Sequence, residues 1–362
     1  MMQSVMRADL HLHSYHSGLA GHLRFLKARD CYSDPEAVYR VAKARGMDVV
    51  TITDHDSIDG CLEFLNRHPD ADDFFVSEEI ECWFPGTSLK AHIGAYGINE
   101  RIHRDVQPLR RNVFEATAYL RSQGVFTSFN HLFFFFRDQL PVEEYVTAAL
   151  SMCDALEVRN GTMLPEHNLL IEQLLRDWDS TAVWLGGSDS HTLSGIGTTF
   201  TEVAAFASFG EPSRSEVRRL GAPREVSKDD APAIAFLNGL RAGRARPGGR
   251  HGSTLRVARE IYGVVSCYWL SLLGVGRQDL SWRRRAVGLG FSTISMPFEF
   301  IPLLTASRGK RGERQYVGYL RQYLGEGDFI GQGRQGGQGG SKSYATSAPR
   351  NGVQAVGPRV SK

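Results

Sequence analysis

The chain has 362 residues, 42% of them hydrophobic and 23% charged, so it can bury a sizeable core and is neither fibrous nor disordered throughout. The formal net charge of +2 hides an asymmetry: residues 1–240 carry 22 basic and 34 acidic side chains, net −12, whereas residues 241–321 carry 15 and 4, net +11. The five cysteines are scattered and form no CxxC pair, which excludes a disulfide framework and favours a reduced, cytoplasmic setting.

The N-terminal segment predicts one βαβ unit. Residues 5–10 form a short strand. A helix follows, because Ser33 can cap its start, Pro35 suits its first turn and Gly46 suits its end. Residues 47–53 are a continuous apolar run, which is typical of a strand buried on both faces of a parallel sheet.

The alternation of strand and helix continues along the chain. Short β-branched or aromatic runs predict strands at residues 74–76, 91–94, 125–129, 155–158 and 183–185. Helical patterns cover residues 108–122, 165–177 and 231–242. Strand, polar residue and helix repeat about seven times, which favours an α/β barrel with its site at the carboxyl ends of the strands.

Imidazoles and carboxylates recur directly after these predicted strands. His11 and His13 are alternate residues of a strand end, so both side chains point the same way and can meet one cation. Asp189 and His191 repeat that spacing, and Glu79 is the candidate carboxylate to bridge two ions. Nitrogen and oxygen donors without a thiolate suit zinc, manganese or iron. The candidate ligands are His11, His13, Asp30, His55, Glu79, His92, His131, Asp189 and His191.

Five motifs, in order, resemble those of the PHP family, named for polymerase and histidinol phosphatase. The resemblance covers about residues 4–250 and implies a distorted (β/α)7 barrel with a trinuclear metal site. It further implies one ion on His11, His13, Glu79 and Asp189, a second on Glu79, His92 and His131, and a third on His55, His191 and one more ligand. The motifs are Asp9-Leu-His11-Leu-His13-Ser14, Thr53-Asp54-His55-Asp56, Glu79-Ile80, His92-Ile93-Gly94 and Ser188-Asp189-Ser190-His191.

The remaining ligand of the third ion departs from the family pattern. The family places an aspartate or histidine five or six residues after HxH, where this chain has Gly18 and Leu19. Counting back from the helix start, the expected carboxylate falls on Asp30, which implies an insertion in the first loop. His16 and His22 lie in that insertion and compete with Asp30. Without any of them the site would hold two ions.

The predicted activity is hydrolysis of a phosphate ester by metal-activated water. The leaving group would take its proton from His55, His191 or a metal-bound water. Arg159 and Lys90 are candidate phosphate contacts, although Arg159 could equally form a salt bridge with a carboxylate. The expected substrate is a small phosphomonoester or a nucleotide-like molecule, and a longer nucleic acid could bind the basic segment. Amide hydrolysis is disfavoured, because no strand ends in a lysine that could be carbamylated.

Several neighbours of these residues have supporting roles in the prediction. Asp54 and Asp56 are expected to orient an imidazole through its other ring nitrogen. Glu78 and Glu81 are expected to point away from Glu79. The run of four phenylalanines at residues 133–136 predicts either a buried plug or a stacking wall for a nucleobase.

An Arg/Gly-rich stretch at residues 244–252 suggests a boundary after a barrel of residues 1–250. Residues 251–324 predict a basic, aromatic-rich helical extension, and residues 325–362, rich in glycine, glutamine and serine, predict disorder.

The extension contains two apolar stretches, at residues 262–276 and 286–306. The first is too short to span a membrane, and the second contains a glutamate and two prolines. Helices that pack on the barrel or on a dimer partner are therefore favoured over peripheral membrane contact through residues 255–306. The extension also supports an alternative function, a non-catalytic or weakly catalytic scaffold whose basic helices dock to a membrane surface, nucleic acid or a protein partner.

Overall fold

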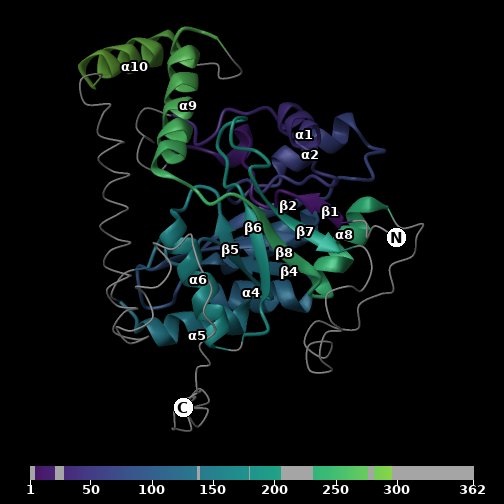
Figure 1. Cartoon of the computed structure of the whole chain (residues 1–362). Helices are drawn as coiled ribbons and strands as arrows, with labels where there is room; N and C mark the ends of the chain where they lie inside the picture. The colour runs from purple at the N-terminus through teal and green to yellow at the C-terminus, as the bar shows by residue number, and fades with distance from the viewer. Residues whose placement is uncertain are drawn as a thin grey trace, which may run out of the picture. The chain divides into compact units, whose positions relative to one another are not determined.

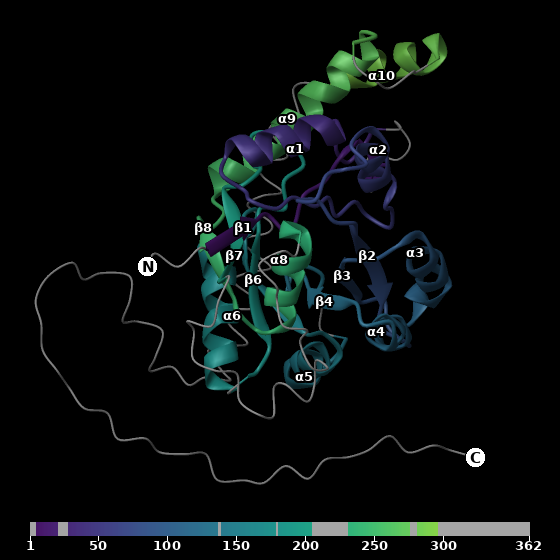
Figure 2. The same cartoon turned by 90° about the vertical axis from the view of Figure 1, so that its right-hand side faces the viewer.

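The computed structural model describes residues 5–20, 28–136, 139–178, 180–204, 231–275 and 281–295. It is a mixed α/β structure, shown in two views in Figures 1 and 2. The strands are β1 (Val5–Ala8), β2 (Ser77–Trp83), β3 (Lys90–Tyr96), β4 (Phe126–Phe129), β5 (Ala155–Asn160), β6 (Val183–Gly187), β7 (Thr199–Ala204) and β8 (Ala245–Gly249). The α-helices are α1 (Pro35–Ala44), α2 (Asp59–Arg67), α3 (Glu100–Val106), α4 (Val113–Ser122), α5 (Val142–Met152), α6 (Pro165–Asp177), α8 (Pro232–Arg241), α9 (Thr254–Leu272) and α10 (Trp282–Ser295). Two short 3-10 helices are η1 (Tyr15–Ser17) and η3 (Gln107–Arg111).

The strands form two sheets and not a closed barrel. One sheet has the order β1-β7-β8 and is antiparallel throughout. The other has the order β2-β3-β4-β5-β6, antiparallel from β2 to β4 and parallel from β4 to β6. The expected alternation fails between β2 and β3, because only residues 84–89 connect them and a parallel crossover needs a dozen residues or more. These two strands therefore form a hairpin.

Residues 47–53 are buried as expected except for Asp48, which is exposed, but they pair at isolated points and do not form a regular strand. Val50 forms a parallel bridge with Phe74, and Thr53 N–H donates to the Leu12 carbonyl at 2.7 Å. Two residues after this segment, His55 forms a parallel bridge with Glu79 of β2. Leu12, near the start of the chain, forms a parallel bridge with Ser190. Residues 47–55 thereby connect the start of the chain to β2. Isolated bridges hold together three loops that are far apart in the sequence.

The predicted helices form, with local corrections. Asp34, not Ser33, caps α1, because its side chain accepts the N–H of Glu36. The helix predicted at residues 108–122 is divided, since Asn112 adopts an extended conformation and its side chain caps α4 by accepting the N–H of Phe114. α6 spans the predicted residues, and α8 differs by one residue at each end.

Two apolar clusters support this arrangement. The larger lies between the sheets and α8, with Phe236 and Leu240 packed against β-strand residues such as Tyr96 and Phe126. The second joins α1 and α2 to the segment with Ile52, and its members include Val38 and Phe64.

Residues 244–252, where the sequence predicts a domain boundary, contain β8. Because β8 pairs with β7, these residues belong to a sheet. Two helices of the predicted extension, α9 and α10, lie beyond it, and they contact each other. Residues 296–324 of the extension and the tail at 325–362 lie outside the described residues. Among the helices that the structure describes, none combines the length and apolar character needed to cross a bilayer.

The apolar cluster that contains Phe236 of α8 predicts how far the free energy of unfolding falls when one buried aromatic ring is removed. Phe236 is fully buried, so Phe236→Ala should lower the free energy of unfolding by about 3–5 kcal/mol, as expected for truncating a core phenylalanine. Ile234, on the same helix, is 47% exposed, so Ile234→Ala should change it by less than about 1 kcal/mol. Urea unfolding of both variants measures the difference, and equal effects would contradict the assigned packing.

Candidate metal centre

The candidate ligands converge at the loops drawn together by these bridges. His11 and His13 follow β1 on either side of Leu12, which bridges to Ser190. The Asp189 N–H donates to the His11 carbonyl at 2.8 Å, and the His13 N–H donates to the Ser190 carbonyl at 3.1 Å. The two motifs that are farthest apart in sequence are therefore held together by their backbones.

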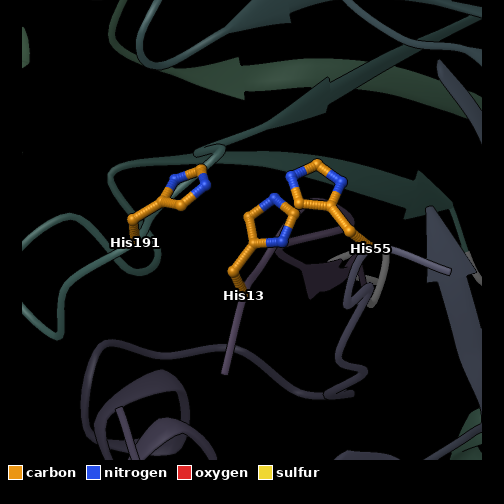
Figure 3. Close-up of side chains that lie close together, drawn as sticks. All are labelled: His13, His55 and His191. Atoms are coloured by element: carbon orange, nitrogen blue, oxygen red, sulfur yellow. The ribbon is translucent and has the colours of Figure 1, made fainter. Parts of the chain in front are cut away.

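Three imidazoles face one another on one side of the cluster, as Figure 3 shows. The ring centroid of His13 lies 4.2 Å from that of His191 and 4.5 Å from that of His55. Such close approach of three rings that can each carry a positive charge is unfavourable unless they are neutral or share a ligand.

Glu79 lies at the centre of the cluster. Its Oε1 atom is 3.1 Å from His11 Nε2, 3.2 Å from His131 Nε2 and 3.2 Å from His92 Nδ1. Its Oε2 atom is 3.0 Å from His55 Nδ1 and 3.8 Å from His13 Nε2. One fully buried carboxylate thus faces five imidazoles. Glu79 lies within β2 and His92 within β3, so the hairpin presents them from mid-strand and not from strand ends.

Two more carboxylates complete the cluster. Asp189 Oδ1 lies 3.4 Å from both His11 Nε2 and His13 Nε2. Asp30 Oδ2 lies 2.8 Å from His191 Nε2 and 3.4 Å from His55 Nε2, so the structure places Asp30 where the third ion was expected.

Of the two competitors of Asp30, one is placed by the structure. His16 Nε2 pairs with Glu63 at 2.7 Å and takes no part in the described cluster. His22 lies outside the described residues.

The donor atoms fall into small groups in which all atoms lie within 4.8 Å of one another, and each group could hold an ion. These groups contain eight of the nine candidate ligands, and Asp30 approaches them through its contacts with His191 and His55. Within the groups, Glu79 occurs with His92 and His55 and also with His131 and His11, whereas the resemblance implies one ion on Glu79, His92 and His131. The groups are His13, His55 and His191; His11, His13 and Asp189; His11, Glu79 and His131; and His55, Glu79 and His92.

Buried polar atoms at the centre of this cluster lack hydrogen-bond partners among the described residues. They include Nε2 of His11 and of His13, Oε2 of Glu79, Oδ2 of Asp30 and both ring nitrogens of His92. Leaving buried donors and acceptors unsatisfied is costly, and such groups call for an explanation. Divalent cations would give these lone pairs their partners, so the residues present fit a multi-metal centre.

The surroundings of the cluster lower the pKa of Glu79 and of His13, and they raise the pKa of four other imidazoles, those of His11, His55, His92 and His191. Burial raises the pKa of Glu79, but the imidazoles of His11, His92 and His55 outweigh this and hold it well below its usual range. Burial and the neighbouring His191 and His55 lower the pKa of His13 to about 3. An ionised carboxylate and a neutral imidazole are the forms that bind metal.

Glu157 is a supporting residue that the sequence argument missed. Its Oε1 lies 2.8 Å from His11 Nδ1, and its Oε2 accepts the backbone N–H of His131 at 2.9 Å. A carboxylate on the far ring nitrogen fixes the tautomer, so that Nε2 of His11 carries the lone pair toward Glu79. The available signal was a glutamate between the apolar residues Leu156 and Val158 of β5.

Amide and hydroxyl groups orient the two central carboxylates. Asn130 Nδ2 donates to Glu79 Oε1 at 2.9 Å. Asn160 Nδ2 and Thr162 Oγ1 donate to Asp189 Oδ2 at 3.2 and 2.8 Å. The two donors to Asp189 bind Oδ2 and leave Oδ1 facing the imidazoles, whereas Asn130 binds the same Glu79 oxygen that faces the imidazoles.

The predicted role of Asp54 is fulfilled indirectly, and that of Asp56 is wrong. Asp54 accepts the hydroxyl of Ser17 at 2.8 Å, and that hydroxyl lies 2.9 Å from His13 Nδ1. Asp56 instead pairs with Arg110 and accepts the N–H of Glu81.

The expected orientation of Glu81 is wrong, because residues two apart in a strand share a face. Glu81 Oε2 lies 3.6 Å from His92 Nε2 and 2.7 Å from Lys90 Nζ. Partial burial raises its pKa, but the nearby His92 imidazole and Lys90 ammonium group outweigh this and lower it to about 2. Glu78 points away as expected, yet it is buried and pairs with His103 at 2.8 Å.

Arg159 is not among the clustered residues. Its guanidinium lies 3.2 Å from Glu172 on α6, which corresponds to the salt-bridge alternative. Lys90, which pairs with Glu81, lies much nearer the cluster.

The four phenylalanines divide between both predicted roles. Phe133 and Phe136 are buried in the core. Phe134 is half-exposed and contacts the ring of His131, with a centroid distance of 5.3 Å. Phe135 lies 4.6 Å from the ring of His92. Two of the rings thus form a buried plug, and the other two lie beside candidate metal ligands.

Comparison with known proteins gives limited matches. No protein-family model matches the chain. An uncharacterized protein from Methanocaldococcus jannaschii is 45% identical over 58 residues, which is 16% of this chain and 33% of that protein. The match therefore spans about one-third of the relative's length.

Among solved structures, a two-domain protein from Bacteroides vulgatus, containing a predicted PHP-like metal-dependent phosphoesterase, is 18% identical with a TM-score of 0.42, covering 72% of this chain and 70% of its own. The lesion-specific endonuclease PfuEndoQ from Pyrococcus furiosus is 14% identical with a TM-score of 0.38, covering 84% and 90%. An amidohydrolase from Chromobacterium violaceum is 14% identical with a TM-score of 0.41, covering 52% and 89%. The family that the motifs resemble is thus named among similar structures, while the roles of individual residues depend on the geometry above.

The cluster predicts which residues control metal content. His13→Ala and Asp189→Ala should each lower the manganese or zinc retained after buffer exchange, because each removes a buried donor. Asp30→Ala should also lower it, whereas His16→Ala should not, since His16 pairs with Glu63. Elemental analysis measures the metal content, and a loss on His16→Ala without one on Asp30→Ala would reverse the assignment of the third ion.

Metal binding should also depend on pH. Burial lowers the pKa of His191, but the carboxylates of Asp30 and Asp189 outweigh this and raise it to about 9. Metal-free protein at pH 7 therefore holds a proton on His191 that a bound ion must displace. Affinity should rise as the pH increases from 7 to about 9, with proton release visible by calorimetry in buffers of different ionisation enthalpy. Binding without proton release would contradict ligation by this imidazole.

Proposed function

We propose that the protein is a metal-dependent phosphoric ester hydrolase of the PHP family, with its site on the two-sheet α/β fold described above. The observation that carries the proposal is the buried Glu79 carboxylate surrounded by five imidazoles, with Asp189 and Asp30 completing the set. This donor set suits two or three ions of zinc, manganese or iron. When bound, such ions polarise phosphoryl oxygens and lower the pKa of water.

The exposure of the ligands indicates where a substrate would enter. The side chains of His55, His191 and Asp30 are 22–25% exposed, whereas those of His11 and His13 are at most 2% exposed. The solvent-facing side of the cluster is therefore the side with His55 and His191. Both imidazoles stand where they could pass a proton to a leaving group, which supports their proposed catalytic role.

The surroundings of the cluster support a small phosphomonoester or nucleotide-like substrate. Lys90 places an ammonium group beside Glu81 at the edge of the cluster, where it could contact an anionic substrate. Phe134 and Phe135 place aromatic rings next to His131 and His92, and a planar base could stack there.

A second candidate function is a scaffold that docks through the extension to an anionic membrane surface. Leu273, Val275, Trp282 and Val287 are exposed around the junction of α9 and α10. Arg283 follows Trp282 directly, so apolar and basic groups occur together, as in interfacial helices. Binding to anionic but not neutral vesicles, without any hydrolysis, would favour this candidate.

The hydrolase proposal predicts activity that depends on metal and on Glu79. Protein supplemented with manganese or zinc should hydrolyse a chromogenic phosphomonoester, and a chelator should abolish the reaction. Glu79→Gln should reduce kcat/KM more than the roughly 10–100-fold typical of losing a supporting residue, because the charged bridge itself is lost. His16→Ala is the matched control. A metal-loaded wild type inactive across a broad panel of phosphoesters would overturn the proposal.

The two candidate phosphate contacts should behave differently. Arg159→Ala should leave KM close to the wild-type value, because its guanidinium is engaged with Glu172 outside the cluster. Lys90→Ala should raise KM, since the ammonium group lies beside the site. Steady-state kinetics on one substrate measures both, and a larger effect of Arg159→Ala would restore its original assignment.

A further inference from the structure

Helix α9 of the extension contacts the loop that carries Asp189 and His191. Glu260 of α9 is only 5% exposed, and its Oε2 accepts the backbone N–H of His191 at 3.2 Å. The hydroxyl of Ser190 donates to the same oxygen at 3.4 Å. A carboxylate from outside the predicted barrel thus holds the backbone of a candidate metal ligand.

A second residue of α9, one helical turn before Glu260, binds the same loop. Arg256 Nη2 donates to the carbonyls of Ser188 at 3.4 Å and Gly195 at 3.1 Å. The arginine therefore binds acceptors at both ends of the loop, and Glu260 binds donors in its middle. Residues four apart lie on the same face of a helix, so this face of α9 matches the polarity of the loop.

The packing between α9 and the loop is close. A Cβ atom at Gly263 would lie 2.6 Å from Cγ2 of Thr192, the residue after His191. A Cβ atom at Gly195 would lie 2.5 Å from Oε1 of Glu260. Helix and loop approach each other at positions where only glycine fits.

The far end of α9 packs on the segment that carries Asp30. Tyr268 and Leu272 form an apolar cluster with Ala28, and Tyr32 packs against it. Asp30 lies between Ala28 and Tyr32 in sequence, and its carboxylate is 2.8 Å from His191 Nε2. One helix thus contacts both segments whose side chains meet at the third-ion position.

We propose that α9 is the positioning element for the Asp30–His191 side of the metal centre, with Glu260 as its principal positioning residue. The inference rests on the proposed function, since it concerns the same cluster. Helix α9 contacts Ala28 and Tyr32 on either side of Asp30 and also the backbone of His191, so it supports both partners of the 2.8 Å contact between Asp30 and His191. Helix α9 of the extension then contributes to the geometry of the metal centre.

The test uses the full-length chain and a matched set of variants at Glu260. Glu260→Leu keeps the side-chain bulk and removes the acceptor, whereas Glu260→Gln keeps an acceptor oxygen. Arg259→Ala, an exposed neighbour on the same helix, is the control. The readout is the affinity of the weakest-bound manganese or zinc ion, titrated into chelator-treated protein, with urea unfolding of each variant alongside.

The inference predicts that Glu260→Leu weakens that ion by about 10–100-fold, that Glu260→Gln retains most of the affinity, and that Arg259→Ala matches the wild type. Gly263→Ala provides a second variant, because its methyl group displaces Thr192 while alanine favours the helix. It should also weaken the ion. Wild-type ion affinity in both Glu260→Leu and Gly263→Ala would overturn the inference.

Ion affinity does not depend on hydrolysis, so the two proposals fail separately. A wild type that binds its ions but cleaves no phosphoester contradicts the proposed function alone. An active wild type whose Glu260→Leu and Gly263→Ala variants both bind ions normally contradicts the role of α9 alone.

Discussion

The constraint on which this structure depends is the burial of one carboxylate, Glu79, among five imidazoles. Burying ionisable groups without compensating partners is among the most costly arrangements in a protein. Here the cost is concentrated at one point, where Glu79 is fully buried and its Oε2 has no hydrogen-bond partner among the described residues. Divalent cations at this point would balance the carboxylates and engage the imidazole lone pairs, and the surrounding structure is arranged to permit this.

Residues outside the cluster hold several of the candidate ligands in place. Glu157 holds the far nitrogen of His11, Asp54 acts on His13 through Ser17, and Asn130 orients Glu79. The backbone contributes single bridges, such as His55 to Glu79, and does not form a continuous ladder at the cluster. The β2–β3 hairpin also contributes, because it places Glu79 and His92 on adjacent strands. Preorganisation of this kind costs stability locally and is typical of functional sites.

The sequence was sufficient to predict which side chains converge and where most helices lie, but not how the converging side chains are held in place. His11, His13, Asp189 and His191 could be found because spacing of two in an extended segment gives one direction, independent of the fold. Glu157 and Glu260 were missed, because their roles depend on contacts across 146 and 69 residues that no local pattern encodes. The hairpin was mistaken for part of a parallel alternation, although the short link at residues 84–89 was the available signal. Asp30 was found only by counting from a helix start, and its support from α9 depends on tertiary packing.

The most direct test of the central claim is anomalous diffraction from crystals grown with manganese or zinc, measured on both sides of the absorption edge. The account predicts two or three anomalous peaks between Glu79 and the surrounding imidazoles, one of them in contact with His191 and Asp30. A metal-supplemented crystal with no peak in the cluster, and with Glu79 held only by hydrogen bonds from protonated histidines, would contradict it.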